Sequence, residues 1–338
     1  MRSETDAAVD IAVLRRGVHG MPIEEYAAAL CERLPDRTVR VAETPSEERR
    51  LLERTTVATA RTVAPERLPA PDDGALSLFA CAYAGYDHLP MAALEERGVA
   101  VTTASGVHAP NAAEHAVGTL LAFVRGLPEG LRRQQRRQWR HFRVDELAGS
   151  TVAVVGLGAI GSAVVERLAA FEVEVVGVRR SPERGGPSAV DDVVGSDALH
   201  EALSRADAVV LACPLTDATR GMIDAEAIET LGPDGIVVNV ARGPVVDTEA
   251  LIEALRGNEL RAAALDVTDP EPLPADHPLW TFENVLVTPH NAGHTPAYYE
   301  RLADVVAENV RRGSSTGNWT GLHNQVLAPG RAGDTDGG

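Results

Sequence analysis

The chain has 338 residues, 44% of them hydrophobic and 24% charged, a balance typical of a globular protein long enough for two domains. Its formal net charge of −17 and pI near 5.0 argue against a nucleic-acid footprint, which needs a basic domain or stripe. No apolar stretch approaches the roughly 18 residues of a membrane-spanning helix, so no membrane class is expected.

The first residues are polar and acidic and lack the basic-then-apolar order of a secretory signal, so a cytoplasmic location is expected. Three cysteines, Cys31, Cys81 and Cys213, show no CxxC spacing, which favours neither a disulfide framework nor a metal site. We predict that all three are small buried apolar residues.

All 32 basic residues are arginine, because the sequence contains no lysine. Together with the acidic balance, this composition indicates either a salt-adapted acidic surface or a GC-rich genome. The densest basic segment, RRQQRRQWR at residues 132–140, favours a helix face paired with acidic side chains over a polyanion site.

The first hundred residues alternate short β-branched runs with segments whose apolar residues recur at helical spacing. Strands are predicted at residues 11–14, 38–41, 76–80 and 99–102. Helices are predicted at residues 23–34, 46–54 and 90–97, and the proline-containing stretch 65–74 is predicted to be a surface loop. This alternation is typical of a parallel sheet.

A second alternation follows a predicted helix at residues 111–125, whose apolar stripe must be buried somewhere. Strands are predicted at residues 151–155, 173–178, 208–212, 236–239, 262–265 and 285–287. Six strands with intervening helices indicate a doubly wound Rossmann domain that binds a dinucleotide. From Gly313 onward the chain is rich in Gly, Ser and Asp and is expected to fray.

A glycine-rich turn follows the first strand of this second alternation. Its sequence, Gly156-Leu157-Gly158-Ala159-Ile160-Gly161, has G-x-G-x-x-G spacing, and its position between a strand and a helix favours a phosphate site over a simple corner. Gly156 would permit the tight turn, Gly158 the approach of a pyrophosphate, and Gly161 close packing of helix on strand. Ala159 and Ile160 would open the helix whose N–H groups face the phosphates.

The end of the next strand bears on which nicotinamide cofactor is used. NAD-specific folds place Asp or Glu there, about 20 residues past the glycines, to bind the ribose 2′-hydroxyl. Here the strand ends in Arg179-Arg180-Ser181, whose side chains can form charge-assisted hydrogen bonds with a 2′-phosphate. The sequence therefore favours NADP(H) over NAD(H), the alternative being that these arginines are ordinary solvated charges.

Three further segments carry a resemblance to a known family. They are NVARG at residues 239–243, DVTDPEP at 266–272 and TPHNAG at 288–293, each just after a predicted strand. In order and placement they resemble the signature segments of the D-isomer-specific 2-hydroxyacid dehydrogenases. The resemblance covers about residues 82 to 311.

This resemblance implies an α/β protein in which a Rossmann domain is inserted in a smaller flavodoxin-like substrate domain, with the site in a cleft. The substrate domain would comprise residues 1–105 and 300–338, and the nucleotide domain residues 106–299. The resemblance also implies a homodimer whose two-fold contact includes residues 111–125, which would account for the apolar stripe there.

The family's catalytic roles carry over to three residues. Arg242 would bind the substrate carboxylate, because a guanidinium grips it as a fork. His290 would give a proton to the substrate carbonyl in reduction and take it back in oxidation. Glu271 would hold the imidazole in one tautomer and favour its protonated form. Each residue alone would more often be a surface or capping residue than a catalyst, but all three in this order favour catalysis.

Other site positions follow from the same resemblance. Further cofactor contacts are implied for Cys213, Pro214, Thr219, Val240, Ala241, Arg242, Asp266, His290 and Gly293. Tyr83, Ala84 and Gly85 match the family loop whose backbone N–H groups meet the substrate carboxylate. His277 and His294 are weaker candidates than His290, and Trp280 is expected to pack rather than to touch substrate.

Two departures from the family pattern leave the substrate open. Thr268 stands where an aromatic residue is usual and Asn291 where an apolar one is usual, so glyoxylate, hydroxypyruvate, pyruvate and branched 2-oxo acids all fit. An NADP-dependent 2-oxo acid reductase is favoured, and the main alternative is a non-catalytic, dinucleotide-sensing protein like the corepressors related to this family. Formate dehydrogenase is disfavoured because its N-terminal segment and its Gln beside the histidine motif are absent. The chain length disfavours a phosphoglycerate dehydrogenase with a regulatory domain.

Overall fold

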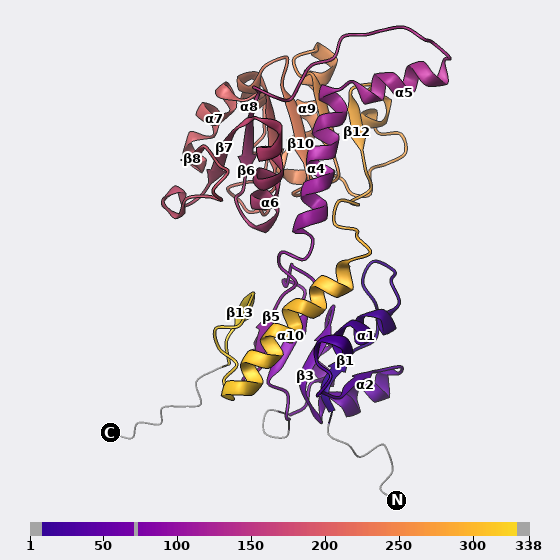
Figure 1. Cartoon of the computed structure of the whole chain (residues 1–338), viewed down its shortest axis with the longest axis vertical. Helices are drawn as coiled ribbons and strands as arrows, with labels where there is room; N and C mark the ends of the chain where they lie inside the picture. Colours follow the sequence, from indigo (N-terminus) through magenta and orange to yellow (C-terminus); the bar gives the residue numbers. More distant parts are fainter. Residues whose placement is uncertain (1–8, 71–73, 330–338) are drawn as a thin grey trace, which may run out of the picture. The chain divides into compact units, whose positions relative to one another are not determined.

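The computed structural model describes residues 9–70 and 74–329, and the chain divides into two compact units. The first unit comprises the chain up to Val107 and from Thr295 onward, and the second is His108–His294. Each unit has a β-sheet with helices packed on it (Figure 1). Within the described ranges, no helix is both long enough and apolar enough to cross a membrane.

The first unit is built on a six-stranded sheet in the order β13-β5-β4-β3-β1-β2. Its strands are β1 (Val9–Val13), β2 (Val39–Val41), β3 (Thr55–Ala60), β4 (Leu78–Cys81), β5 (Ala100–Thr102) and β13 (Gln325–Leu327). All neighbours are parallel except β13 and β5, which are antiparallel. The carboxyl ends of the five parallel strands therefore meet at one edge.

Helices cover both faces of this sheet. Side chains alternate between the two faces along each strand, so both faces carry apolar side chains that must be buried. They are α1 (Ile23–Arg33), α2 (Pro45–Leu52), α3 (Met91–Glu95) and α10 (Tyr298–Thr316), with a short 3-10 turn, η2 (Pro65–Arg67). Ile11 packs in one core with α1 and α10, while its neighbour Ala12 packs in the other with Leu52 and Leu94.

The second unit has a seven-stranded, fully parallel sheet in the order β12-β11-β10-β9-β6-β7-β8. Its strands are β6 (Thr151–Val155), β7 (Glu174–Arg179), β8 (Asp192–Gly195), β9 (Ala208–Leu211), β10 (Ile236–Asn239), β11 (Ala262–Leu265) and β12 (Val285–Val287). The order reverses between β6 and β9, which is the doubly wound arrangement that places ligands at the carboxyl ends of the strands.

Helices again cover both faces of the sheet. They are α4 (Ala109–Val124), α5 (Leu127–Gln135), α6 (Ala159–Leu168), α7 (Leu199–Arg205), α8 (Ala225–Leu231) and α9 (Thr248–Gly257). The 3-10 turns are η3 (Ala169–Phe171), η4 (Pro182–Arg184), η5 (Ser196–Ala198), η6 (Gly243–Val245) and η7 (Pro278–Thr281). The predicted apolar stripe of α4, including Val117, Leu120 and Val124, is buried with α6 inside the unit's own core. It therefore needs no partner chain to cover it.

The sequence interpretation missed β3, although this strand is central. Its residues, TTVATA, lack the large apolar side chains of the other strands. Thr55 and Thr59 are buried, and burial is possible because both hydroxyls are satisfied. Thr55 Oγ1 donates to the carbonyl of Asp10 (3.1 Å), and Tyr26 Oη lies 2.9 Å from Thr59 Oγ1.

Three other expectations were wrong. The nucleotide sheet has seven strands and not six, because the edge strand β8 went unpredicted. Residues 313–329 do not form a frayed tail, since α10 continues to Thr316 and β13 pairs with β5. The rest of the predicted tail, residues 330–338, lies outside the described ranges, as do residues 71–73 of the predicted loop. Cys31 is exposed, whereas Cys81 and Cys213 are buried as predicted.

Candidate active site

The glycine turn joins β6 to α6 in the second unit. Gly156 has φ of 95°, and a Cβ there would lie 2.7 Å from the backbone of Cys213, so this position requires glycine. A Cβ on Gly161 would overlap the carbonyl of Gly156, whereas a Cβ on Gly158 would meet nothing within 4 Å. The turn thus combines tight packing with one open side, and α6 starts at Ala159 directly behind it. This geometry fits a pyrophosphate.

A hollow of about 300 Å³ opens beside this turn. Besides Gly156 and Gly158, it is lined by the predicted cofactor residues Arg179, Arg180, Ser181, Cys213, Pro214 and Thr219. The structure therefore brings together residues from the ends of β6, β7 and β9, which are neighbouring strands. A groove across the carboxyl ends of these strands fits an extended dinucleotide.

The arginines at the end of β7 differ in their contacts. Arg179 is half-buried, and its guanidinium donates to the carbonyl of Gly185 at 2.5 Å, which closes the loop containing η4. Arg180 is exposed and forms no ion pair among the described residues. Arg184, which the sequence analysis did not select, lines the same hollow and is also exposed. The only signal for it was Pro182, which opens the turn that brings Arg184 back toward β7.

The loop after β9 forms the other wall of the hollow. Thr219 Oγ1 donates to the carbonyl of Pro214 (2.7 Å) and accepts from the N–H of Thr216 (2.8 Å), so the loop is internally braced. Burial raises the pKa of the Cys213 thiol to about 11. Cys213 is therefore a neutral packing residue and not a nucleophile.

His290 and Glu271 lie in contact, as their predicted roles require. His290 Nδ1 is 2.6 Å from Glu271 Oε1, and both side chains are about half exposed, at 48% and 42%. His290 has a left-handed φ of 52°, and its N–H donates to the carbonyls of Asp266 (2.8 Å) and Thr288 (2.9 Å). These contacts fix the ring's Nδ1 side and leave Nε2 for a ligand.

The buried carboxylate of Asp266 holds the His290 loop in place. It accepts hydrogen bonds from the N–H groups of Asn291 (2.8 Å) and Ala292 (2.9 Å) and from Thr288 Oγ1 (2.5 Å). His115 Nε2 on α4 lies 3.7 Å from the same carboxylate. Asp266, which is also a predicted cofactor contact, thus ties β11 to the loop after β12 through its carboxylate.

Arg242 follows β10, the neighbour of β11, and is exposed. Its guanidinium donates to the carbonyl of Ala241 (2.7 Å). Asn239 shapes the turn, since its amide donates to the carbonyl of Arg242 (3.0 Å) and accepts from the N–H of Ala241 (3.0 Å). Val240 and Ala241 are buried, so these two present mainly backbone to a ligand. Arg242, Asp266 and His290 therefore follow three adjacent strands at one edge.

The remaining predicted positions have other surroundings. Gly293 accepts a hydrogen bond at its carbonyl from His108 Nδ1 (2.7 Å). His277 Nδ1 accepts from the N–H of Leu279 at the start of η7, which is a capping role. Trp280 is 51% exposed, so the expected packing role holds only in part. Among the described residues no cluster of three or more His, Cys, Asp or Glu could hold a metal ion.

The predicted substrate loop belongs to the first unit, at the carboxyl end of β4. Tyr83 is half-buried there, and Ala84 and Gly85 are exposed. The N–H groups of Ala84, Gly85 and Tyr86 have no hydrogen-bond acceptor among the residues described. Three consecutive donors without a protein partner are suited to an anion.

Together, these features define a dinucleotide-binding α/β protein with a histidine–carboxylate pair at the ligand edge of its sheet. The chain belongs to the D-isomer specific 2-hydroxyacid dehydrogenase family, because residues 117–292 match the family model described as "D-isomer specific 2-hydroxyacid dehydrogenase, NAD binding domain". This confirms the resemblance inferred from the three sequence segments.

Curated relatives agree with this membership. A D-3-phosphoglycerate dehydrogenase of Methanocaldococcus jannaschii is 37% identical over 235 residues, which are 68% of this chain and 44% of the relative. A glyoxylate reductase of Thermofilum pendens is 36% identical over 232 residues, which are 67% of this chain and 68% of the relative. The chain thus spans less than half the length of the first relative.

The fold is similar to a crystal structure of a D-isomer specific 2-hydroxyacid dehydrogenase from Xanthobacter autotrophicus Py2 in complex with NADPH and MES. The TM-score is 0.77 at 30% identity, over 95% of this chain and 98% of that chain. This similarity confirms the predicted fold class, two parallel-sheet domains of which one is a Rossmann domain.

Proposed function

We propose that the protein is a D-2-hydroxyacid dehydrogenase that reduces small 2-oxo acids with NADP(H). The observation that carries this proposal is the 2.6 Å contact between His290 Nδ1 and Glu271 Oε1. It orients an imidazole at the same sheet edge as the glycine turn, with Nε2 available to a substrate oxygen. The names of the relatives, a glyoxylate reductase among them, favour small 2-oxo acids.

Bound NADPH supplies the hydride that forms the new C–H bond at the substrate's carbonyl carbon. The chain's own residues manage proton and charge. As the C=O π electrons move onto oxygen, His290 donates its Nε2 proton to that oxygen, and in oxidation it takes the proton back. Glu271 accepts the Nδ1 hydrogen bond, which fixes the ring orientation and balances the charge of the imidazolium. Arg242 binds the carboxylate next to the reacting carbon.

The preference for NADP(H) rests on the end of β7. The hollow there is lined by Arg180, Ser181 and Arg184, and no acidic side chain of the described residues lines it. A 2′-phosphate accepts charge-assisted hydrogen bonds from such groups, whereas a carboxylate would repel it. Arg179, which donates to Gly185, has the supporting role of closing the turn that presents Arg184. The similar structure from Xanthobacter autotrophicus contains NADPH.

The deciding experiment is steady-state turnover of the full chain on glyoxylate, hydroxypyruvate, pyruvate and a branched 2-oxo acid, each with NADPH and NADH. We expect turnover of at least one acid and a higher kcat/KM with NADPH. Tight NADPH binding without any turnover would favour the alternative, a non-catalytic dinucleotide-sensing protein. A preference for NADH would overturn only the cofactor assignment.

A cytoplasmic location is part of the proposal, and cell fractionation tests it.

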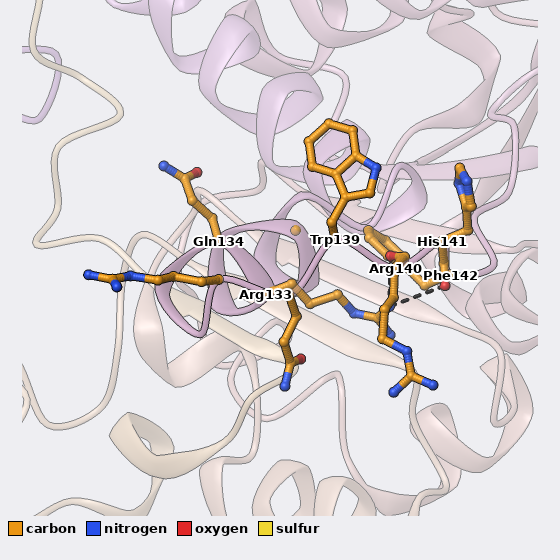
Figure 2. A pocket seen from close by; sticks show the side chains of 9 residues that line it. Arg133, Gln134, Trp139, Arg140, His141 and Phe142 are labelled. Carbon is orange, nitrogen blue, oxygen red and sulfur yellow. Dashed lines mark hydrogen bonds between the residues drawn. The ribbon is translucent and has the colours of Figure 1, made fainter.

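The arginine-rich segment after α4 has two features. The predicted pairing with acidic side chains holds for the first part of the segment, since Arg132 lies 2.9 Å from Glu129 and Arg136 lies 3.6 Å from Glu283. The predicted helix face does not extend to residue 140, because α5 ends at Gln135. Arg133, on α5, stacks on the ring of Phe142 from the segment beyond the helix, at 4.6 Å, and both residues line a hollow of about 630 Å³ (Figure 2). Figure 2 shows the Trp139 indole standing clear of the other labelled side chains.

We propose that a second copy of the chain covers this segment. The family resemblance implies a homodimer with its contact at residues 111–125, but the apolar stripe there is buried within the unit, and exposed apolar side chains lie in the segment that follows it. Leu127, Leu131 and Trp139 are 56%, 61% and 98% exposed, which is unusual for large apolar side chains gathered in one short segment. Sedimentation velocity should show a dimer that Trp139→Glu weakens, while Trp280→Glu, a control at another exposed tryptophan, leaves it intact. A monomeric parent chain would contradict this assignment.

A further inference from the structure

One face of α4 carries polar side chains that the proposed chemistry does not use. His108, which is the N-cap of α4, Asn111 and His115 follow one another at intervals of three and four residues, so they lie on one side of the helix. His108 Nδ1 lies 2.7 Å from the carbonyl oxygen of Gly293, and Asn111 Nδ2 donates to the carbonyl of Ala292 at 2.6 Å. This face of α4 therefore holds the loop after β12, which carries the proposed proton donor.

His115 meets the same loop at Thr288, just before His290. His115 Nε2 lies 3.1 Å from Thr288 Oγ1, and Thr288 Oγ1 lies 2.5 Å from Asp266 Oδ1. A carboxylate only accepts hydrogen bonds, so the single hydroxyl proton of Thr288 goes to Asp266. The hydroxyl oxygen then offers His115 only a lone pair, so His115 Nε2 must carry a proton. The three side chains therefore form one chain of hydrogen bonds that runs from α4 to the carboxylate.

The carboxylate at the end of this chain is buried and depends on the donors around it. The Asp266 side chain is 2% exposed, and its oxygens also accept from the N–H groups of Asn291 (2.8 Å) and Ala292 (2.9 Å). Among the described residues no arginine lies within ion-pair distance of it, whereas His115 Nε2 lies 3.7 Å from it. A buried carboxylate without its hydrogen bonds is costly, so each donor that faces Asp266 helps to determine where the loop lies.

The backbone of His290 gives this support a purpose. Its φ of 52° lies in the left-handed region, which is unfavourable for a residue other than glycine and persists only where surrounding contacts hold it. The His290 N–H donates to the carbonyls of Thr288 and Asp266, and the Asp266 carboxylate accepts from the next N–H, that of Asn291. Loss of the hydrogen bond between Thr288 and Asp266 would therefore loosen the chain on both sides of His290.

We propose that His115 is a positioning residue for His290. Its Nε2–H holds the Thr288 hydroxyl in the orientation that bonds to Asp266, and the loop then keeps the imidazole of His290 at one position and angle. The inference rests on the proposed function, in which that imidazole transfers a proton, because proton transfer requires a fixed geometry. In this role His115 acts only through Thr288 and Asp266 and touches no reacting atom.

Kinetics of the full chain on a 2-oxo acid test this role. His115→Leu removes the donor at similar size and should lower kcat by about 3- to 10-fold, while the Kd for NADPH stays within about twofold. His115→Gln keeps an N–H donor near the position of Nε2 and should recover most of that loss. Unchanged kcat in His115→Leu, or no recovery in His115→Gln, would overturn the inference.

A matched control and a double-mutant cycle locate the effect. His200→Leu is the control, because His200 Nδ1 on α7 also pairs with a threonine, Thr230 Oγ1 on α8 (3.0 Å), and it should leave kcat unchanged. Thr288→Val removes the hydroxyl through which His115 acts. The double variant of His115→Leu and Thr288→Val should therefore lose little more kcat than Thr288→Val alone. Additive losses, or an equal loss in His200→Leu, would overturn the inference.

Heteronuclear NMR of the histidine rings tests the hydrogen-bond chain without turnover. The signal of His115 is the one that disappears in His115→Gln, and in the neutral ring, above about pH 8, it should show the proton on Nε2. A proton on Nδ1 would overturn this inference and leave the dehydrogenase proposal standing, because Thr288 would then donate to His115 and not to Asp266. Absence of turnover in the parent chain would overturn the proposed function and this inference with it.

Discussion

Two corners of the second unit hold their proposed functional side chains in opposite ways. At the ends of β11 and β12, His290 is fixed through its ring, its own N–H and a loop tied to buried Asp266. At the end of β7, Arg180 and Arg184 are exposed and form no ion pair among the described residues. Proton transfer requires a fixed distance and angle, whereas a phosphate can be recognised by charges that adjust to it. The two corners should therefore respond differently to substitution.

The largest effect is expected at His290. His290→Ala should lower kcat by about 10²- to 10⁴-fold, the usual contribution of general acid–base catalysis, while the Kd for NADPH stays within about twofold. Stopped-flow turnover and fluorescence titration measure the two quantities. His277→Ala is the control, because His277 only caps η7. Turnover within about threefold of the parent would remove His290 from its proposed role.

The next effect concerns the support of the histidine loop. Asp266→Asn replaces one acceptor oxygen by a donor that faces backbone N–H groups, so it should cost about 1–3 kcal/mol of unfolding free energy and lower kcat by roughly 10- to 100-fold. Urea unfolding and steady-state kinetics measure both.

Asp247→Asn separates support of the loop from general stability. Asp247 also accepts two backbone N–H bonds, from Glu249 and Ala250, but at the start of α9. It should lose stability, by about 1 kcal/mol, without a comparable loss of kcat. If both variants lose kcat equally, Asp266 does not act through the position of His290.

A smaller loss of kcat is expected at Glu271. Glu271→Gln keeps an acceptor for His290 Nδ1 but removes the charge that balances the imidazolium, so kcat should fall by about tenfold. Glu271→Ala also frees the ring and should lose more. The difference in kcat between the two variants measures how much Glu271 contributes by orienting the His290 ring, and the loss in Glu271→Gln measures the contribution of its charge. The affinity for NADPH is the control and should not change. Equal rates in Gln, Ala and parent chains would show that Glu271 has neither role.

At the other corner, Arg184→Gln and Arg180→Gln should each raise the Kd for NADPH by about 5- to 10-fold and leave the Kd for NADH within about twofold. Arg179→Gln should act more weakly, because Arg179 contacts Gly185 and not the open hollow. Arg205→Gln is the matched control, since Arg205 is paired with Glu174 and Asp192. Equal weakening of both cofactors would mean that these arginines do not recognise the phosphate.

Features set by local sequence were predictable. The glycine turn is one case, because the backbone conformation at Gly156 and the packing at Gly161 depend on the strand–turn–helix segment itself. The order of the motifs after β10, β11 and β12 likewise placed Arg242, Glu271 and His290 in one unit.

Features that depend on tertiary pairing were not predictable. β3 is buried between β1 and β4, where Tyr26 and the backbone of Asp10 satisfy its threonines, and β13 is a strand because it pairs with β5. The carboxylate of Asp266 bonds to a loop 25 residues further along the chain, which no local pattern shows. Arg184 was missed for the same reason, since the Arg179–Gly185 contact closes the turn that presents it.

The smallest effect concerns charges that no hydrogen bond fixes. With a formal net charge of −17 and no lysine, the folded chain repels itself, and screening should stabilise it. Between about 0.01 and 0.3 M KCl the screening length falls from about 30 Å to below 10 Å, so the Tm should rise by a few degrees. Over the same range the Kd for NADPH should increase, because salt also screens the charges of Arg180 and Arg184. The kcat at saturating cofactor should stay nearly constant, because His290 is oriented by short hydrogen bonds. Differential scanning fluorimetry and turnover in the same buffers measure all three. A flat Tm would favour a GC-rich genome over salt adaptation as the origin of the lysine-free composition, and a kcat that falls with salt would contradict the contrast between the two corners.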